Sequence, residues 1–269
     1  MAGADYFTDK VVIVTGASTG IGRALALEAA RAGARVVLAS RNREALDSLA
    51  DEIGGGPDRT LVLPTDVTQL EQVTALIERT QAEWGRIDVL IANAGLYVRG
   101  PVTTLTLADF ETALDVNFYG MLRAVLGVLP GMLERSEGHI VLMSSVDGRK
   151  GLPLDAPYVA AKSAMRGFSS VLRQELHGTG VGLTIVYPGR VDTPMIDHLR
   201  FHPVSAKIPA EAVARATLAA IRHNRVEVVI PGLAWALIFL DLLMPRVADW
   251  WVRFFHLQGW EQRSSDRQA

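Results

Sequence analysis

Short apolar runs alternate with longer amphipathic segments along most of the chain. The first run, Val11 to Val14, is rich in β-branched residues, too short for a helix and suited to a buried parallel strand. A pattern with helical spacing follows from Ile21 to Ala29. The same alternation predicts further strands over residues 34–40, 60–65, 87–92, 139–144, 182–187 and 226–230, and helices over 41–53, 66–85, 107–133, 158–176 and 210–223. This order predicts an α/β fold, a doubly wound parallel sheet of seven strands with helices on both faces.

An apolar extension, residues 233–260, follows the last predicted strand. Phe239 belongs to a first helical pattern that Pro245 ends, and Trp250 and Phe254 belong to a second. Two helices that cap a cleft or form a subunit interface are the favoured interpretation. Aromatic residues flanked by arginine also suit the headgroup region of a membrane, so contact with a membrane surface stays open as the second reading.

Length and composition narrow the class of protein. The 269 residues suit a single α/β domain, with a core over about residues 8–232 and the extension after it. The net charge of −2 argues against a nucleic-acid partner, which would call for a basic face. The absence of cysteine fits a reducing compartment, and the first ten residues contain no signal-peptide pattern. We therefore expect a cytoplasmic protein, with peripheral membrane attachment as the variant, and no apolar run long enough to span a bilayer.

A glycine-rich turn joins the first predicted strand to the first predicted helix. Gly16, Gly20 and Gly22 give the spacing G-x-x-x-G-x-G, with Ser18, Thr19 and Ile21 between them. A helix N-terminus offers unpaired N–H groups and the positive end of its dipole, so such a turn can hold phosphate. Taken alone, the spacing also fits an ordinary strand–helix turn.

Polar and glycine residues follow several other predicted strands. Because parallel strands end at one edge of the sheet, where ligands of such folds bind, these residues are expected on one rim. They are Ser40 and Arg41, Asp66 and Val67, Asn93, Ala94 and Gly95, Ser145, and the segment from Pro188 and Gly189 through Val191 to Thr193.

Tyr158 and Lys162 are spaced so that both side chains lie on one face of a helix. A nearby ammonium lowers the pKa of a phenol, which suits the pair to moving a proton onto or off an oxygen. Ser145 could donate a hydrogen bond to a substrate oxygen. Asn117 is a poor residue for a helix interior, which indicates a special role or a local kink.

The motifs TGASTGIG, ANAG, YVAAK and YPGRVDTP, together with Asn117 and Ser145, resemble the short-chain dehydrogenase/reductase family in its single-domain, Rossmann-type form. The resemblance implies that Tyr158 is the catalytic acid/base and that Lys162 lowers its pKa and holds the nicotinamide ribose. It implies that Ser145 polarises the substrate oxygen and that Asn117 supports a water relay through Lys162. It also implies that Asp66 and Val67 contact adenine and that the helices over 107–133 and 158–176 pair in a homodimer or homotetramer. Ala92 departs from the family, which often has asparagine there.

The end of the second predicted strand indicates which cofactor is bound. Sites for NAD usually place a carboxylate there, whereas this chain has Ser40 and Arg41. A guanidinium can pair with a 2′-phosphate through two hydrogen bonds. We therefore predict NADP(H) rather than NAD(H).

The substrate is a small molecule that the sequence specifies poorly. Apolar residues in two loops suggest a pocket for a lipophilic alcohol or ketone, and ordinary loop packing explains them equally well. They are Leu96, Tyr97 and Val98, and Met195, Ile196, Leu199 and Phe201. A 3-oxoacyl-thioester reductase, a steroid- or retinoid-type dehydrogenase, and a cofactor-binding scaffold or sensor with little turnover stay open. No metal is expected, since His198 and His202 lack partner carboxylates.

Overall fold

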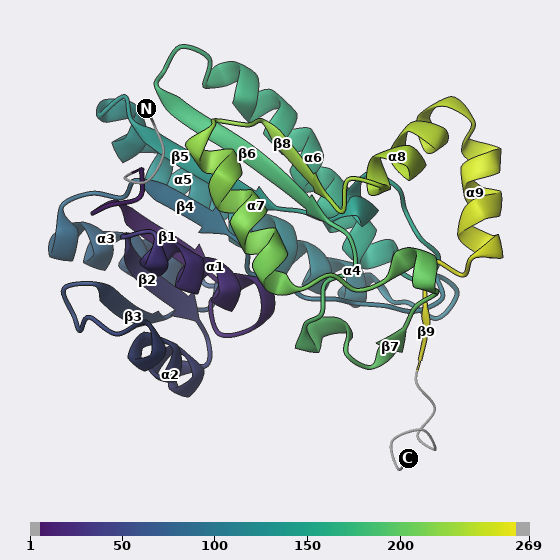
Figure 1. Ribbon diagram of the computed structural model, residues 1–269, viewed down its shortest axis with the longest axis horizontal. Helices are drawn as coiled ribbons and strands as arrows, with labels where there is room; N and C mark the ends of the chain where they lie inside the picture. The colour runs from purple at the N-terminus through teal and green to yellow at the C-terminus, as the bar shows by residue number, and fades with distance from the viewer. Residues whose placement is uncertain (1–5, 262–269) are drawn as a thin grey trace.

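The computed structural model describes residues 6–261 and is built around one seven-stranded parallel sheet (Figure 1). Its order is β3-β2-β1-β4-β5-β6-β8. The first three strands are added towards one edge of the sheet and the later strands towards the other, so the strand order reverses between β1 and β4. The strands are β1 (Val11–Thr15), β2 (Arg35–Ser40), β3 (Thr60–Pro64), β4 (Val89–Ala92), β5 (Gly138–Met143), β6 (Val181–Pro188) and β8 (Glu227–Ile230). The predicted sheet is confirmed, and β3, which ends at Pro64, is an edge strand.

Two helical layers cover the sheet, one on each face. Successive side chains of a strand point to one layer and then to the other. Val11 and Ile13 of β1 pack into the cluster that contains the helices α3, α5 and α6, whereas Val12 and Val14 pack into the cluster with α1, α2 and α7. The helices are α1 (Gly20–Arg31), α2 (Arg43–Ile53), α3 (Leu70–Trp84), α4 (Leu107–Leu114), α5 (Gly120–Glu134), α6 (Ala156–Glu175) and α7 (Ala210–Arg222), with short 3₁₀ turns at Val146–Gly148, Pro194–Ile196 and Pro203–Ser205. Strands buried on both faces explain the continuous apolar runs in the sequence.

A π-helical turn, Asp115–Tyr119, joins α4 to α5, so that Leu107–Glu134 is one continuous helix. By length and composition it could cross a membrane, with a mean hydropathy of 1.3, and the expectation that no apolar run is long enough was wrong. Met121 and Val125 of this helix pack against Leu90 and Ile140 of the sheet. This is the position of a core helix in an α/β fold.

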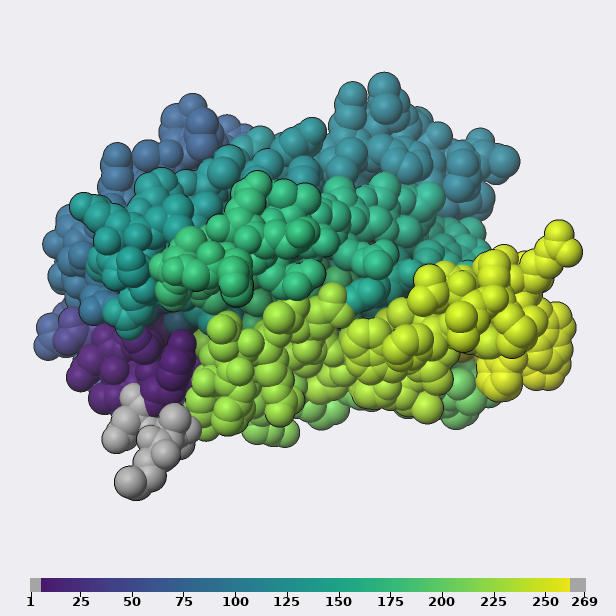
Figure 2. Space-filling model, turned by 90° about the horizontal axis from the view of Figure 1, so that it is seen from above, coloured from purple at the N-terminus to yellow at the C-terminus, as the bar shows by residue number. Residues whose placement is uncertain are grey.

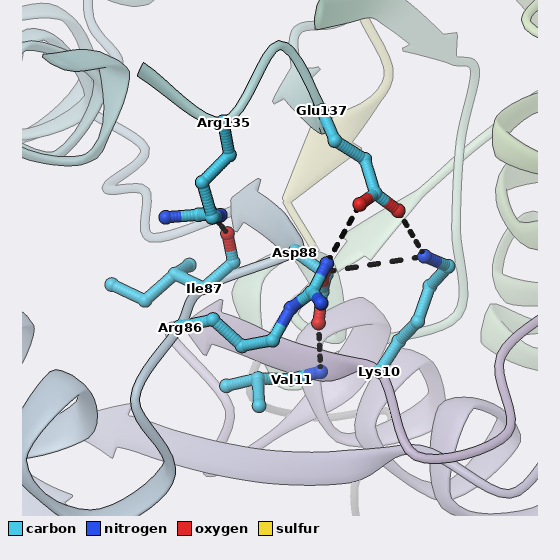
Figure 3. Close-up of polar contacts among 7 residues, drawn as sticks. All are labelled: Lys10, Val11, Arg86, Ile87, Asp88, Arg135 and Glu137. Carbon is cyan, nitrogen blue, oxygen red and sulfur yellow. Dashed lines mark hydrogen bonds and ion pairs between the residues drawn. The ribbon is translucent and has the colours of Figure 1, made fainter. Parts of the chain in front are cut away.

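Charged residues tie together the edge of the sheet where the strands begin (Figure 3). Asp88 is buried, accepts a hydrogen bond from the backbone N–H of Val11 at 2.8 Å, and pairs with Arg86. Glu137 accepts hydrogen bonds from Lys10 and from Arg86, both at 2.9 Å. These contacts join the starts of β1, β4 and β5, far from the edge where the glycine turn lies.

The predicted C-terminal helices are α8 (Ala234–Leu243) and α9 (Pro245–Phe254). Met244 separates them. They pack mainly on each other and lie at one end of the molecule (Figures 1 and 2). The chain then returns to the body, where β9 (Trp260–Glu261) pairs antiparallel with β7 (Leu199–Arg200). The small two-stranded sheet was not predicted, because two-residue strands have no periodicity to detect.

Candidate active site

One cavity of about 450 Å³ lies where the strands of the large sheet end. The residues that the sequence placed on this rim line it, except Asp192, and Tyr158 and Lys162 line it too. The lining residues include Gly16, Ser18, Thr19, Gly20, Ile21, Gly22, Ser40, Arg41, Asp66, Val67, Asn93, Ala94, Gly95, Ser145, Pro188, Gly189, Val191 and Thr193. The volume is in the range that small-molecule and cofactor sites occupy.

The glycine turn is shaped for close approach of a ligand. A Cβ on Gly22 would lie 2.1 Å from the carbonyl oxygen of Gly16, and one on Gly16 would lie 2.8 Å from the Cα of Ala94. Helix α1 begins at Gly20, and Thr19 before it makes no side-chain cap. The first N–H groups of α1 therefore face the cavity without a side-chain acceptor, as a phosphate site requires.

Asn93 fastens the turn to the neighbouring strand. Its Nδ2 donates to the carbonyls of Thr15 at 3.0 Å and of Gly16 at 3.3 Å, and its backbone N–H donates to the hydroxyl of Thr15 at 3.0 Å. The amide thus holds the ends of β1 and β4 together at the point where the strand order reverses. The alanine at position 92 leaves these contacts intact.

The far end of the cavity has groups that fit an adenosine 2′-phosphate. The Ser40 hydroxyl is buried and has no hydrogen-bond partner among the described residues. Arg41 is exposed, lines the cavity and takes part in no salt bridge within residues 6–261. At Asp66, burial acts to raise the pKa, but hydrogen bonds from Thr68 and the positive charge of Arg41 lower it below its usual value. An unpaired hydroxyl and a free guanidinium leave donors for a phosphate.

Ser145, Tyr158 and Lys162 meet at the other end, from the loop after β5 and from α6. Ser145 Oγ accepts a hydrogen bond from the N–H of Asp147 at 3.1 Å. Lys162 is buried, its Nζ donates to the carbonyl of Met143 at 2.8 Å, and burial lowers its pKa to about 7. Nζ lies 5.5 Å from the centroid of the Tyr158 ring.

The expectation that Lys162 lowers the pKa of Tyr158 stays a prediction, and Lys162 is not among the main influences on that pKa here. Burial raises the pKa of Tyr158 above its usual range, and the charge of Asp147 raises it further. The Ser145 hydroxyl and the charge of Arg190 act in the opposite direction. Lys162 Nζ donates to the Met143 carbonyl, and burial lowers the pKa of Lys162 itself.

Asn117 lies in the π-helical turn behind the cavity wall rather than in it. The side chain is buried, donates to the carbonyls of Leu96 at 2.8 Å and of Ala113 at 2.9 Å, and accepts from the N–H of Leu96 at 3.1 Å. It thereby holds the loop after β4 beside the cavity. The predicted local irregularity of the helix is confirmed, while the water relay stays a prediction.

Sequence reasoning missed a buried ion pair on the substrate side of the cavity. Arg190 Nη1 donates to Asp147 Oδ2 at 3.2 Å, and both residues line the cavity with Tyr158. Arg190 Nη2 also donates to the carbonyl of Leu257 at 3.0 Å. A signal existed: Asp147 follows β5 and Arg190 follows β6, and these strands are neighbours.

Tyr97 packs edge-on against Tyr158, with ring centroids 5.1 Å apart. Its hydroxyl donates to buried Asp155 at 2.6 Å, and burial raises the pKa of Asp155 to about 6. The apolar loop residues divide into two groups. Leu96, Tyr97, Met195 and Ile196 line the cavity, whereas Val98, Leu199 and Phe201 do not. His198 and His202 belong to no group of three or more potential metal ligands among the described residues.

Comparison with known sequences shows the same kind of protein along most of the chain. The family model described as short chain dehydrogenase matches residues 10–202. An uncharacterized oxidoreductase of Staphylococcus aureus is 37% identical over 219 residues, which is 81% of this chain and 93% of the relative. The uncharacterized oxidoreductase YxnA of Bacillus subtilis is 32% identical over 272 residues, covering 97% of this chain and 76% of its own. That alignment is long enough to take in α8 and α9.

Solved structures agree with these sequences. A short chain dehydrogenase/reductase from Burkholderia phymatum in complex with NAD has a TM-score of 0.83 at 26% identity, covering 90% of this chain and 95% of its own. A variant of actinorhodin polyketide ketoreductase with NADPH has a TM-score of 0.77 at 28% identity, covering 84% of this chain and 97% of its own. The similar structures thus hold either nicotinamide dinucleotide.

Proposed function

The chain belongs to the short-chain dehydrogenase/reductase family and is an oxidoreductase, and on that premise we propose that it transfers a hydride between NADP(H) and the carbonyl or alcohol carbon of a lipophilic substrate. The observation that carries this proposal is one cavity. One end of the cavity is lined by the glycine turn, which suits a phosphate, and by the unpaired Arg41 guanidinium. The other end is lined by Ser145 and Tyr158.

Each polar residue near Tyr158 has a role in this chemistry. When bound, NADPH supplies the hydride. The Ser145 hydroxyl donates a hydrogen bond to the substrate oxygen as negative charge grows on it. Tyr158 gives its proton to that oxygen, and the raised pKa keeps the phenol in the protonated form that reduction needs. Lys162, which is held by the Met143 carbonyl, lies beside the Tyr158 ring.

The preference for NADP(H) rests on Ser40 and Arg41. The orphaned Ser40 hydroxyl and the unpaired Arg41 supply donors to a 2′-phosphate, and no carboxylate follows β2 to repel it. The lipophilic substrate rests on Leu96, Met195 and Ile196 in the cavity wall. A homodimer or homotetramer is supported by exposed Leu107, Leu126 and Val171 on the long helices.

A screen of NADPH oxidation with ketones, aldehydes and acyl thioesters identifies the substrate class. With an active substrate in hand, Tyr158→Phe removes the proton donor and should lower kcat by about 10²–10⁴-fold while NADPH binding, followed by its fluorescence, is kept. Tyr119→Phe is the matched control, because that tyrosine is exposed and does not line the cavity. Unchanged turnover in Tyr158→Phe contradicts the proposed mechanism.

The cofactor is tested by kcat/KM with NADPH and with NADH. Arg41→Ala removes charge-assisted hydrogen bonds and should reduce the preference for NADPH by about 10–100-fold. Arg43→Ala is the control, since Arg43 is exposed beside the same turn, pairs with Asp47 and does not line the cavity. A wild-type preference for NADH overturns the cofactor proposal.

A further inference from the structure

The outward-facing surface of α8 and α9 is apolar and lies open. Six large side chains form what we call the outer face, and each is between 41% and 75% exposed. They are Phe239, Leu242 and Leu243 on α8, and Trp250, Trp251 and Phe254 on α9. Ile238, Ala248 and Val252 are buried instead, so these helices have an inner face as well. Large exposed apolar side chains gathered on one helix pair suit an interaction site.

The charges around the outer face are unbalanced. Buried Lys150 donates to Asp241 at 2.7 Å and to Asp249 at 2.5 Å, so one positive charge offsets one of the two negative charges of the helix pair. Arg246 and Arg253 on α9 are exposed and take part in no salt bridge among residues 6–261. Lys150 and the two arginines together outnumber the two carboxylates, so the net charge here is +1.

We propose that the outer face docks onto an anionic lipid surface. Exposed tryptophan and phenylalanine beside arginine suit the headgroup region, where the rings lie among apolar chains and the guanidinium groups reach anionic lipids. Helix α8 has ten residues, too few to span a bilayer, so the protein lies on the surface rather than crossing it. Apolar area and positive charge then act together.

A second copy of the chain fits this surface less well. A twofold contact places the same surface against itself, so Arg246 and Arg253 would face the same arginines of the other copy. Lys150 balances only one of the two carboxylates, so each copy would still bring a net charge of +1 to the contact. An anionic membrane supplies the missing negative charge.

The docking face is connected to the active site. After α9, the carbonyl of Leu257 accepts from Arg190 and that of Gly259 accepts from Arg99, both at 3.0 Å. Arg190 lines the cavity beside Tyr158. On the proposed function, this connection brings the substrate side of the cavity close to a phase in which lipophilic substrates dissolve; the docking itself does not depend on that function.

Co-sedimentation of the full chain with sucrose-loaded vesicles tests the proposal. We expect binding to phosphatidylcholine vesicles that contain phosphatidylglycerol, weaker binding to phosphatidylcholine alone, and release by salt. Phe239→Asp with Trp250→Asp should weaken binding at least about tenfold, because charged groups replace buried apolar area. Arg246→Glu and Arg253→Glu should each weaken it by about fivefold or more on the anionic vesicles.

Leu70→Asp is the matched control, since Leu70 is 56% exposed at the start of α3 and Phe239 is 55% exposed. It should bind as the wild type does, and all variants should keep NADPH binding, which shows that they are folded. The proposal is overturned if the wild type stays in the supernatant with anionic vesicles, or if the paired aspartates leave binding unchanged. Loss of a dimer in the paired aspartates, measured by light scattering without vesicle binding, would instead assign the face to a second copy.

Discussion

At the scale of single residues, the charges around Tyr158 set its protonation. Asp147 raises the pKa of the phenol and Arg190 lowers it, while burial raises it most. These two residues form a pair at 3.2 Å, so each also limits the effect of the other. The combined effect of burial and of these two charges on the pKa of Tyr158 determines the pH range in which the phenol can give up its proton.

Neutralising the two charges should therefore move the alkaline limb of the pH–rate profile in opposite directions. Asp147→Asn removes a charge that raises the pKa of Tyr158, so the limb moves to lower pH. Arg190→Met removes a charge that lowers it, so the limb moves to higher pH. The measurement is kcat/KM against pH, and shifts of the same sign in both variants would contradict this account. Thermal unfolding is followed alongside, because Arg190→Met leaves a buried carboxylate unpaired and costs about 3–5 kcal/mol.

His139 makes stability depend on pH in mild acid. Burial lowers the pKa of His139 to about 4, and its Nε2 lies 2.8 Å from the Thr184 hydroxyl. The unfolded chain binds a proton near its usual pKa of about 6.5, so stability is complete above that pH and falls as pH decreases towards 4. The loss should reach up to about 3 kcal/mol, and His139→Gln should flatten it. Urea unfolding at several pH values measures the slope, and exposed His177→Gln should keep the wild-type slope.

The sequence was informative about residues that belong to recurring motifs and less so about their partners. The glycines of the turn, Asn93 and Ser145 were placed on one rim and line one cavity, and Tyr158 and Lys162, which were placed on one helix face, line it too. The Asp147–Arg190 pair escaped notice because its members are 43 positions apart and meet only when β5 and β6 are neighbours. The direction in which the pKa of Tyr158 is shifted was not predicted either. Burial of Tyr158 and the hydrogen bond from Lys162 to Met143 both depend on packing.

At the scale of elements, the turn between β1 and α1 depends on the absence of side chains. A Cβ on Gly22 would meet the backbone oxygen of Gly16 at 2.1 Å, and backbone cannot rotate away. Gly22→Ala should open the turn, weaken NADPH binding at least about tenfold and destabilise the fold by about 1–3 kcal/mol.

Gly167→Ala is the control for that substitution. Gly167 lies inside α6, and no atom lies within 4 Å of a Cβ built there. Alanine is the better helix former, so this variant should be more stable by about 0.5–1 kcal/mol and bind NADPH normally. Fluorescence titration and urea unfolding give both quantities, and equal NADPH affinity in the two variants would show that the turn does not hold the cofactor.

Elements with a strong periodicity were predicted with ends close to those seen, and irregular elements were not. The helix over 107–133 was expected to be regular apart from Asn117, and it contains the π-helical turn Asp115–Tyr119. A π turn has no sequence pattern of its own; it arises because Asn117 binds the backbone of Leu96 across the loop. Such a contact depends on the tertiary fold.

At the scale of the whole molecule, α8 and α9 are held by few contacts. Amphipathic spacing predicted both helices, but it could not say which face would be covered, because that depends on the position of the rest of the chain. Neither helix lines the cavity; the segment after α9 instead contacts Arg190, which does line it. Lys150, which bonds to one carboxylate on each helix, is their main polar attachment.

Lys150→Met should loosen the helix pair without affecting the cofactor site. Burial acts to lower the pKa of Lys150, but Asp241 and Asp249 raise it above its usual value, so the charged form is held firmly. Without the Lys150 ammonium, amide hydrogen exchange of residues 234–254 should become faster than in the wild type. Exchange in α1 and the affinity for NADPH should stay the same. Unchanged exchange over these residues would mean that apolar contacts alone hold the pair.

The contact between Arg99 and Gly259 has a consequence for the order in which the protein is made. It joins positions 160 apart, whereas the glycine turn needs only β1, α1 and the loop after β4. A ribosome adds about 5–20 residues per second, so Gly259 emerges on the order of ten seconds after Arg99. During that interval a nascent chain can assemble the glycine turn but not the contact between the loop after β4 and the C-terminal segment. The turn that suits a phosphate can therefore form before the C-terminal segment is in place.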